Sequence, residues 1–338
     1  MKAVCLQEPN KIGIAELPVP EMKEGYALIK IKSMGICGSD IGAYRGTNPL
    51  VSYPRIIGHE LAGEIVAIGD NPKGFKVGDR VIPDPYLYCD KCYPCSLKRT
   101  NCCEDLKVLG VQTDGGMEEY YLHPADMLVA LPDSIPWDIA PLAEPLTIAL
   151  HALHRGQVHA GQHMAINGAG AIGILAALCA LSYGAEPILI DLVEERLAYA
   201  RSLGVKHTIN LTTQELIPTI SEITNGRMAE VVMEASGANA AVRNTLDMVS
   251  YAGTIVLTGW PKKETPLPTD VITKKELDVR GSRTSAGEFE EAIELIETGK
   301  VDVRAILSKV VTLEEVPAAV EELSAHPDRY LKITAVID

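Results

Sequence analysis

The 338-residue sequence has no run or stripe of lysine and arginine, and its formal net charge is −14. Nucleic-acid phosphates and anionic lipid surfaces repel a strongly acidic chain that has no basic patch, so neither is expected as its main partner. The longest apolar stretch, residues 171–181, is too short to cross a bilayer. The sequence also has no low-complexity tract and no internal repeat, which argues against a solenoid.

The start of the sequence has no secretory signal pattern. Residues 1–4 lead directly into a strand-like run, without a basic segment, an apolar segment and a cleavage site in succession. Thiols that are available for a metal also fit a reducing compartment, so we expect a cytoplasmic protein. Hydrophobic residues make up 47% of the chain and charged residues 22%, as in soluble globular proteins, and 338 residues are enough for two domains.

Four of the eight cysteines lie close together in the sequence, at Cys89, Cys92, Cys95 and Cys103. Gaps of two residues let short loops turn the sulfurs inward, and four thiolates complete the tetrahedral coordination of one zinc. Such a site has no open position, so it is expected to hold a loop in shape and not to react. The alternative is a disulfide pair or four ordinary buried thiols, and Cys102 is a second possible fourth ligand.

The first 130 or so residues contain short strand-like segments separated by glycine and proline, at residues 26–32, 61–69 and 78–83. This density of strands and turns predicts a partly open β-barrel. The cysteine segment, residues 89–103, is expected to leave that barrel as a loop.

From about residue 141 the pattern changes to strands that alternate with helices. Strands are expected at residues 163–167, 187–191, 231–235 and 254–258, and helices at residues 142–153, 172–183 and 194–203. This alternation predicts an α/β domain with a doubly wound parallel sheet of the Rossmann type. We expect it to span residues 146–275, while residues 1–145 and 276–338 together form a discontinuous, mostly β domain.

A glycine-rich loop lies between the first of these strands and the helix that follows. Gly168, Gly170 and Gly173 have the G-x-G-x-x-G spacing of dinucleotide-binding loops, with Ile172 inside the motif. Gly168 permits the tight turn, Gly170 lets the backbone approach a pyrophosphate, and Gly173 lets the helix pack closely on the sheet. The helix N-terminus offers N–H donors to the phosphates. These residues predict a dinucleotide site, the alternative being a glycine-rich turn without a ligand.

Asp191 ends the next strand, 21 residues after Gly170. An acidic side chain at this place accepts hydrogen bonds from the ribose hydroxyls and repels a 2′-phosphate. Leu192 and Val193 offer no cation to replace it, so NAD is expected in preference to NADP. Arg196, one helical turn further on, is a further candidate cofactor contact and the one residue that favours NADP.

Cys37 and His59, 22 residues apart, are candidates for a second metal site. Thiolate and imidazole are preferred zinc ligands, and a catalytic zinc keeps three protein ligands and one open position. Taken singly, Cys37 fits a buried thiol better, and His59 fits a hydrogen-bonded structural histidine. The case for a metal depends on the motifs around them.

With these motifs the chain resembles the zinc-dependent medium-chain dehydrogenase/reductase family over nearly its whole length. Within that family it is most similar to the polyol and sugar dehydrogenases, such as the sorbitol, galactitol-phosphate, sugar-acid and threonine enzymes. The resemblance is carried by residues 35–40 (GICGSD), 58–60 (GHE), 78–81 (GDRV), 143–146 (AEPL) and 168–173 (GAGAIG), and by the four-cysteine segment. It implies a GroES-like catalytic domain, a Rossmann domain that binds NAD, and two zinc ions per chain, one catalytic and one structural. It also favours Cys103 over Cys102 as the fourth structural ligand.

The resemblance implies Cys37, His59 and a carboxylate as ligands of the catalytic zinc. Glu60 and Glu144 are both candidates for the third ligand, because in polyol dehydrogenases one glutamate coordinates the zinc, the other holds its water, and the two can exchange. Glu144 is slightly favoured as the resting ligand, the alternative for it being a carboxylate at a helix N-terminus.

Ser39 resembles the family hydroxyl that hydrogen-bonds the reacting oxygen and passes a proton outward, although a turn-forming serine is the alternative. The sequence departs from the family at Gly42, where many relatives have a histidine that extends the proton relay. The proton is therefore expected to leave through Glu144 or Glu60 and water, or along the cofactor ribose.

The expected activity is hydride transfer between NAD and a secondary alcohol of a polyol, sugar or sugar acid. Threonine or a simple secondary alcohol is the alternative substrate, and a non-catalytic NAD-binding protein with structural zinc alone is the alternative of another class. Arg45, Arg55 and Arg283 could reach an acidic substrate but fit ion pairs better, and Tyr44 fits the pocket or the core. The resemblance implies a homodimer or homotetramer.

Overall fold

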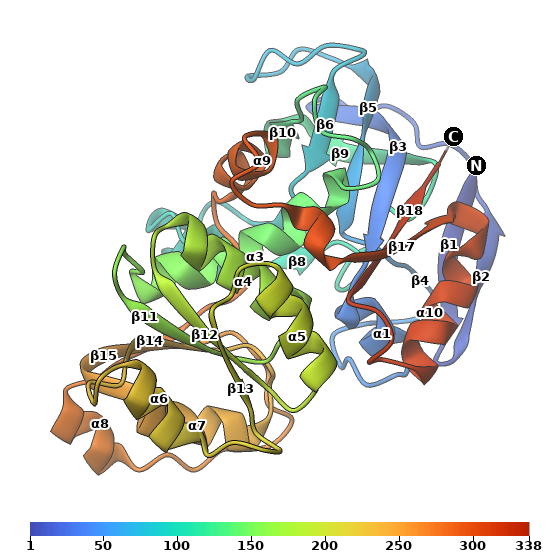
Figure 1. The fold of residues 1–338 in the computed structure, drawn as a ribbon. Coiled ribbons are helices and arrows are strands. Elements are labelled where there is room, and N and C mark those ends of the chain that lie inside the picture. The colour runs from blue at the N-terminus through green and yellow to red at the C-terminus, as the bar shows by residue number, and fades with distance from the viewer. Residues whose placement is uncertain (338) are drawn as a thin grey trace. The chain divides into compact units, whose positions relative to one another are not determined.

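The computed structural model describes residues 1–337, which form two compact units (Figure 1). Unit 1 contains Met1–Glu144, Phe289–Thr298 and residues 306–337, and unit 2 contains Pro145–Glu288 and Gly299–Ala305. The sequence placed the second boundary at residue 276, whereas the units divide after Glu288. The reason is that β16 (Asp278–Gly281) pairs in parallel with β15 (Val249–Leu257), which keeps this segment in unit 2.

Unit 2 is built on a six-stranded sheet in the order β13-β12-β11-β14-β15-β16. Its other strands are β11 (His163–Asn167), β12 (Glu186–Asp191), β13 (His207–Asn210) and β14 (Ala229–Glu234). Every neighbouring pair is parallel, which confirms the predicted doubly wound sheet. The order reverses between β11 and β14, and ligands of such sheets bind at the carboxyl ends of the strands next to this reversal.

Helices cover both faces of the sheet in unit 2 (Figure 1). The helices of one face are α4 (Ala171–Ser182) and α5 (Glu194–Ser202), and those of the other face are α6 (Leu216–Ile223) and α7 (Asn239–Met248). A short helix, α8 (Thr269–Lys275), precedes β16. Because both faces are covered, the central strands are apolar throughout, as the buried run of Ile188, Leu189 and Ile190 shows.

Unit 1 is mostly β-structure. Its largest sheet has the order β10-β6-β5-β3-β18-β17, and β9 also pairs with β3. These strands are β3 (Tyr26–Ile36), β5 (Glu60–Ile68), β6 (Arg80–Pro83), β9 (Tyr120–Pro124), β10 (Leu128–Ala130), β17 (Leu307–Thr312) and β18 (Lys332–Val336). Among the residues described, β10 and β17 at the two ends of this order do not pair with each other. The sheet is therefore open, as predicted for a partly open barrel.

Smaller sheets and a few helices complete unit 1. The remaining strands are β1 (Lys2–Glu8), β2 (Lys11–Glu16), β4 (Arg55–Ile56), β7 (Tyr86–Leu87) and β8 (Lys107–Val108). The helices are α1 (Gly38–Tyr44), α2 (Tyr93–Ser96), α9 (Phe289–Glu297) and α10 (Val316–Ala325). Helix α3 (Ala143–Gly156) starts in unit 1 and continues into unit 2.

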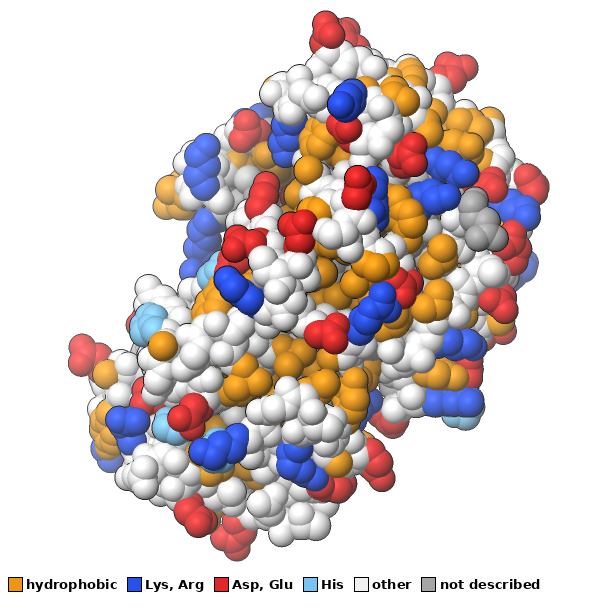
Figure 2. Space-filling model, turned by 45° about the horizontal axis from the view of Figure 1, so that its top comes forward, with side chains coloured by type: hydrophobic (Ala, Val, Ile, Leu, Met, Phe, Trp, Pro, Cys, Tyr) orange, Lys and Arg blue, Asp and Glu red, His pale blue; other side chains and the backbone are white. Residues whose placement is uncertain are grey.

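The surface carries both signs of charge. On the face shown in Figure 2, acidic and basic side chains are interspersed. Within residues 1–337, no helix has the length and the apolar character that crossing a membrane requires.

Candidate functional site

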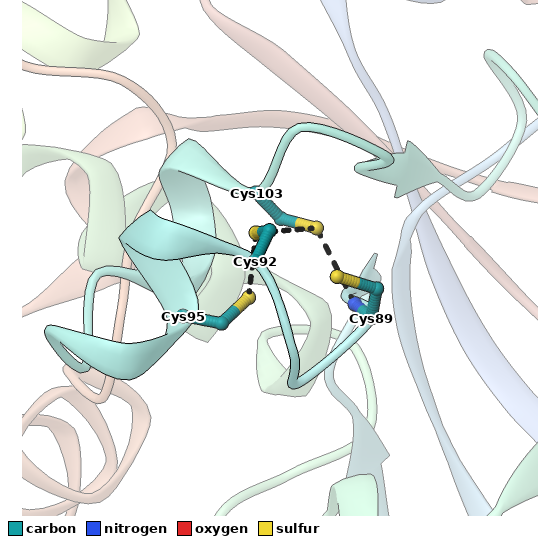
Figure 3. Close-up of side chains that lie close together, drawn as sticks. All are labelled: Cys89, Cys92, Cys95 and Cys103. Carbon is teal, nitrogen blue, oxygen red and sulfur yellow. Dashed lines mark hydrogen bonds between the residues drawn. The ribbon is translucent and has the colours of Figure 1, made fainter.

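Four cysteine side chains converge in the loop that follows β7, and their sulfurs point toward one another (Figure 3). Cys92 Sγ lies 3.4 Å from Cys95 Sγ and 3.9 Å from Cys103 Sγ, and all four sulfurs lie within 4.8 Å of one another. The backbone N–H of Cys89 donates to Cys103 Sγ at 3.3 Å. The eight cysteines are all free, so this group is not a disulfide pair, and Cys102 lies outside it.

The protonation of this group fits a metal. Backbone N–H groups of Glu104 and Cys95 lower the pKa of Cys92 to about 7, whereas burial raises the pKa of Cys95 to about 12. Four neighbouring thiols cannot all ionise without a cation, because each thiolate disfavours the next. A divalent ion that takes thiolate ligands removes this conflict, and the donor set suits a structural zinc.

A second group brings Cys37, His59 and Glu60 together in unit 1, with one ligand atom from each lying within 4.8 Å of the others. Cys37 follows β3, and its backbone N–H donates to Asp40 Oδ2 of helix α1 at 2.9 Å. His59 and Glu60 stand where the chain enters β5. The turn before them needs Gly58, whose φ is +99° and whose added Cβ would meet the side chain of Met117.

His59 is buried, with 5% of its surface exposed. Burial disfavours the charged ring, but the Cys37 thiolate and the carboxylates of Asp40 and Glu144 raise the pKa of His59 well above its usual value. Its Nδ1 has no hydrogen-bond partner, and the same holds for the buried Oε2 of Glu60. Buried polar atoms nearly always have a hydrogen-bond partner. Two buried atoms without one, an imidazole nitrogen and a carboxylate oxygen beside a thiolate, therefore fit the ligands of a metal ion.

Glu60 has a cationic partner that the sequence analysis missed. The Nζ of Lys332 donates to Glu60 Oε1 at 2.5 Å and to the backbone oxygen of Ile36 at 3.2 Å. Burial alone would lower the pKa of Lys332, but the charges of Glu60 and Cys37 raise it above its usual value. The one sequence signal for this lysine is its place at the start of the apolar strand β18.

Glu144, the second residue of α3, is also buried and has a different partner. The hydroxyl of Tyr86, another residue that the sequence did not point to, donates to Glu144 Oε1. Burial raises the pKa of Glu144 to about 7, and burial together with Glu144 raises the pKa of Tyr86. Glu144 is not one of the three residues that cluster most closely. The structure thus groups Glu60, and not the slightly favoured Glu144, with Cys37 and His59.

Ser39, in the first turn of α1, lies beside this group. Its Oγ is 3.4 Å from His59 Nε2. Gly42 has no side chain to extend a relay, and its carbonyl accepts the hydroxyl of Thr47 at 3.2 Å. Position 42 therefore offers Ser39 no side-chain partner for a proton relay.

Two of the three arginines that could reach an acidic substrate have structural partners. Arg45 Nε donates to Ser324 Oγ at 3.0 Å, and Arg55 forms an ion pair with Asp114 at 2.9 Å. Tyr44 packs against the hydrophobic core of unit 1. These contacts agree with the surface and core interpretations. Arg283 is a half-buried residue of unit 2.

The glycine loop of unit 2 connects β11 to α4 at the carboxyl end of the sheet. Gly168 has a φ of +103°, in the left-handed region that glycine tolerates. A Cβ added to Gly173 would lie 1.8 Å from the backbone oxygen of Gly168, whereas a Cβ on Gly170 would meet no atom within 4 Å. Gly173 is thus needed for the helix to pack against the turn, and the backbone at Gly170 is open to a ligand. Ile172 is half-buried in the first turn of α4.

Asp191 ends β12 next to this loop. Its Oδ2 accepts the backbone N–H of Ala169 at 2.6 Å, and its Oδ1 accepts those of Leu192 and Val193 at 2.7 and 2.9 Å. The carboxylate therefore faces the glycine loop from the neighbouring strand. Arg196 lies in the first turn of α5 and is half-buried.

The chain matches the family model of the alcohol dehydrogenase GroES-like domain over residues 23–133 and that of zinc-binding dehydrogenases over residues 171–298. It is 58% identical over 337 residues to an uncharacterized zinc-type alcohol dehydrogenase-like protein of Haemophilus influenzae, covering 99% of this chain and 98% of that one. It is 35% identical to the sorbitol dehydrogenase of Bacillus subtilis, covering 98% and 96%. An Escherichia coli alcohol dehydrogenase solved with NADH superposes with a TM-score of 0.93 at 31% identity, covering 100% and 99%.

Proposed function

The chain belongs to the zinc-dependent medium-chain alcohol dehydrogenase family, and from this membership we propose that it transfers a hydride between NAD and a secondary alcohol of a polyol, sugar or sugar acid. Members of this family are oxidoreductases that act on CH–OH groups, and so is this chain. The observation that best supports catalysis is the group formed by Cys37, His59 and Glu60. A non-catalytic protein with structural zinc alone would not need this second set of ligands.

We propose that Cys37 and His59 hold the catalytic zinc with either Glu60 or Glu144, and that the four clustered cysteines hold the structural one. A zinc ion in the first site would supply the Lewis acidity that lowers the pKa of a substrate hydroxyl, and a bound nicotinamide would supply the acceptor for the hydride. Ser39 Oγ then accepts the hydroxyl proton and passes it on. The carboxylates of the site are buried away from bulk water, so its polar groups act in a medium of low dielectric constant.

The proposed cofactor is NAD, because the Asp191 carboxylate stands where a 2′-phosphate would bring further negative charge. The carboxylate also accepts three backbone N–H groups, so Asp191→Asn keeps the shape of the loop while it removes the charge. We expect the preference for NAD over NADP to fall by about tenfold, which corresponds to about 1.4 kcal/mol of discrimination. The control is Glu194→Gln, which removes an exposed carboxylate three residues further on, at the start of α5. An unchanged preference in Asp191→Asn would remove this residue from cofactor selection.

The test of the reaction is NADH formation by zinc-replete protein with a panel of alditols, sugar acids, their phosphates, threonine and simple alcohols. The panel begins with hexitols because the Bacillus subtilis relative is a sorbitol dehydrogenase. Turnover of one polyhydroxylated compound that chelation abolishes is the expected result. Turnover of threonine or a simple alcohol alone would contradict the substrate class. No turnover, together with one zinc per chain, would favour the non-catalytic alternative.

A further inference from the structure

Each of the two carboxylates beside the candidate metal site has its own buried partner. Glu60 accepts from the ammonium group of Lys332, and Glu144 accepts from the neutral hydroxyl of Tyr86. The side chains of Lys332 and Glu60 are 6% and 0% exposed, so solvent scarcely screens this ion pair. The two carboxylates therefore differ in a direct partner that affects metal binding, because an ammonium group bonds to Glu60 and a neutral hydroxyl bonds to Glu144.

The sheet register explains how Lys332 reaches Glu60. Strand β3 runs between β18 and β5, with Ile36 opposite Ile333 on one side and Gly35 opposite Glu60 on the other. Lys332 thus lies on one flank of β3 and Glu60 on the opposite flank. The absence of a side chain at Gly35 leaves room for the carboxylate, since an added Cβ would lie 1.9 Å from Glu60 Oε2. The backbone oxygen of Ile36 gives the ammonium group a second acceptor and fixes its position.

We propose that Lys332 is a positioning residue that holds Glu60 by Oε1, so that the carboxylate can meet the metal through Oε2 alone and can be released from it. This inference rests on the proposed function, in which Cys37, His59 and a carboxylate hold the catalytic metal. A buried ammonium group competes with the metal for the charge of the same carboxylate, so Glu60 is a weaker ligand than it would be alone.

The charges around the site agree with this role. When all three are ionised around a bound metal, Cys37, Glu60 and Glu144 bring three negative charges, and Lys332 offsets one of them, which leaves two for a divalent ion. Asp40 is a third carboxyl group nearby, and it accepts the backbone N–H of Cys37 at 2.9 Å. Without Lys332 the ligand set would carry one more negative charge than a divalent ion neutralises. Loss of the lysine is therefore expected to tighten metal binding and not to weaken it.

The test compares Lys332→Met with the wild-type protein by zinc competition titration and by cobalt(II) substitution. The spectrum of Cys37→Ser, whose cobalt sits in the four-cysteine site alone, is subtracted to isolate the catalytic site. Zinc affinity is expected to rise about tenfold, the size typical of changes in groups that contact metal ligands. The d–d absorption of cobalt is expected to weaken, because Glu60 adds a ligand that stays bound and coordination rises from four toward five.

Two variants serve as matched controls. Lys332→Arg keeps the positive charge and is expected to retain the wild-type affinity and spectrum. Lys309→Met removes one positive charge from an exposed lysine that pairs with Glu322 in the same unit, and is expected to change neither. If Lys309→Met changed the zinc affinity or the cobalt spectrum as Lys332→Met does, the change would reflect the net charge of the protein and not the position of Lys332.

The double variant Lys332→Met/Glu60→Gln tests whether the lysine acts through Glu60. It removes both buried charges and so avoids an unpaired carboxylate if Lys332→Met alone folds poorly. Its affinity and spectrum are expected to match those of Glu60→Gln, because the two effects are not additive when one residue acts through the other. If the wild-type protein holds two zinc ions per chain and Lys332→Met changes neither the zinc affinity nor the cobalt spectrum, the role of Lys332 is overturned while the proposed function stands. A single zinc ion in the wild-type protein would instead overturn the proposed function.

Discussion

Gly35→Ala is the sharpest single test of the candidate metal site. The added Cβ would lie 1.9 Å from Glu60 Oε2, whereas ordinary contact begins at 3.4 Å, so one of the two must move by about 1.5 Å. The strand β3 is paired on both sides at this point, to β5 and to β18, which prevents the backbone from yielding. We therefore expect the carboxylate of Glu60 to leave the group that it forms with Cys37 and His59.

The expected cost appears in both stability and activity. Overpacking of this size destabilises a core by about 1–3 kcal/mol. A displacement of about 1 Å in a catalytic group lowers turnover by roughly a hundredfold. The assays are zinc content per chain after dialysis, kcat/KM with the best substrate of the panel, and urea unfolding followed by circular dichroism.

Gly38→Ala is the matched control for this prediction. Gly38 stands on the other side of Cys37, and a Cβ added there would meet no atom within 4 Å. It is also the first residue of α1, where alanine is the better helix former, so stability is expected to stay level or to rise slightly. If Gly35→Ala kept both zinc ions and stayed within about twofold of Gly38→Ala in kcat/KM, the placement of Glu60 beside the metal would be refuted.

Three further predictions concern the remaining parts of the molecule. Gly173→Ala should lower the thermal unfolding midpoint of the protein by several degrees, because the added Cβ overlaps a backbone oxygen of the loop. Gly170→Ala should keep this midpoint but weaken NADH binding, measured by fluorescence titration. Glu288→Gln should lower the free energy of unfolding by about 2–3 kcal/mol at pH 7, because two histidines hold this carboxylate in its charged form. Cys95→Ser should lower the unfolding midpoint more than the activity, whereas Cys37→Ser should lower the activity more than the unfolding midpoint. Each variant should lose one zinc ion per chain, measured by metal analysis.

The pH dependence of the Glu288 effect has a definite sign. Burial alone would raise the pKa of Glu288, but hydrogen bonds from His151 at 2.8 Å and His154 at 3.2 Å lower it to about 2. In the unfolded chain the carboxylate of Glu288 binds a proton more tightly than in the folded protein, with a pKa near 4.5. The stabilisation is therefore complete above pH 4.5 and is lost as the pH falls toward 2. The difference in the free energy of unfolding between the wild-type protein and Glu288→Gln should thus become smaller as the pH is lowered from 4.5.

The controls separate these effects from general ones. Glu290→Gln removes the same charge from an exposed position two residues away and should change stability by less than about 0.5 kcal/mol. An equal effect of Glu288→Gln and Glu290→Gln would show that the histidine contacts do not stabilise the fold. Equal loss of NADH binding and of stability in Gly170→Ala and Gly173→Ala would contradict the separate roles given to the two glycines.

The sequence alone determined the features that depend on residues close together in the chain. The alternation of strands and helices after residue 141 indicated the parallel sheet because each element is short and has its own hydrophobic pattern. The spacing of the glycines identified the loop at Gly168 for the same reason, since a tight turn and the start of a helix are local events. The four clustered cysteines are likewise only 14 residues apart at most, and the structure brings their sulfurs together.

Tertiary structure alone decided the contacts between distant segments. Strand pairing determined where the chain leaves unit 2, after Glu288 and not at residue 276, because a sequence does not show which strands pair. Glu60 meets Lys332 across 272 positions of sequence, and Tyr86 meets Glu144 across 58. The sequence could name two glutamates as possible ligands. It could not show that one is held by a buried cation and the other by a hydroxyl, because those partners come from strands that only the folded sheets bring to the site.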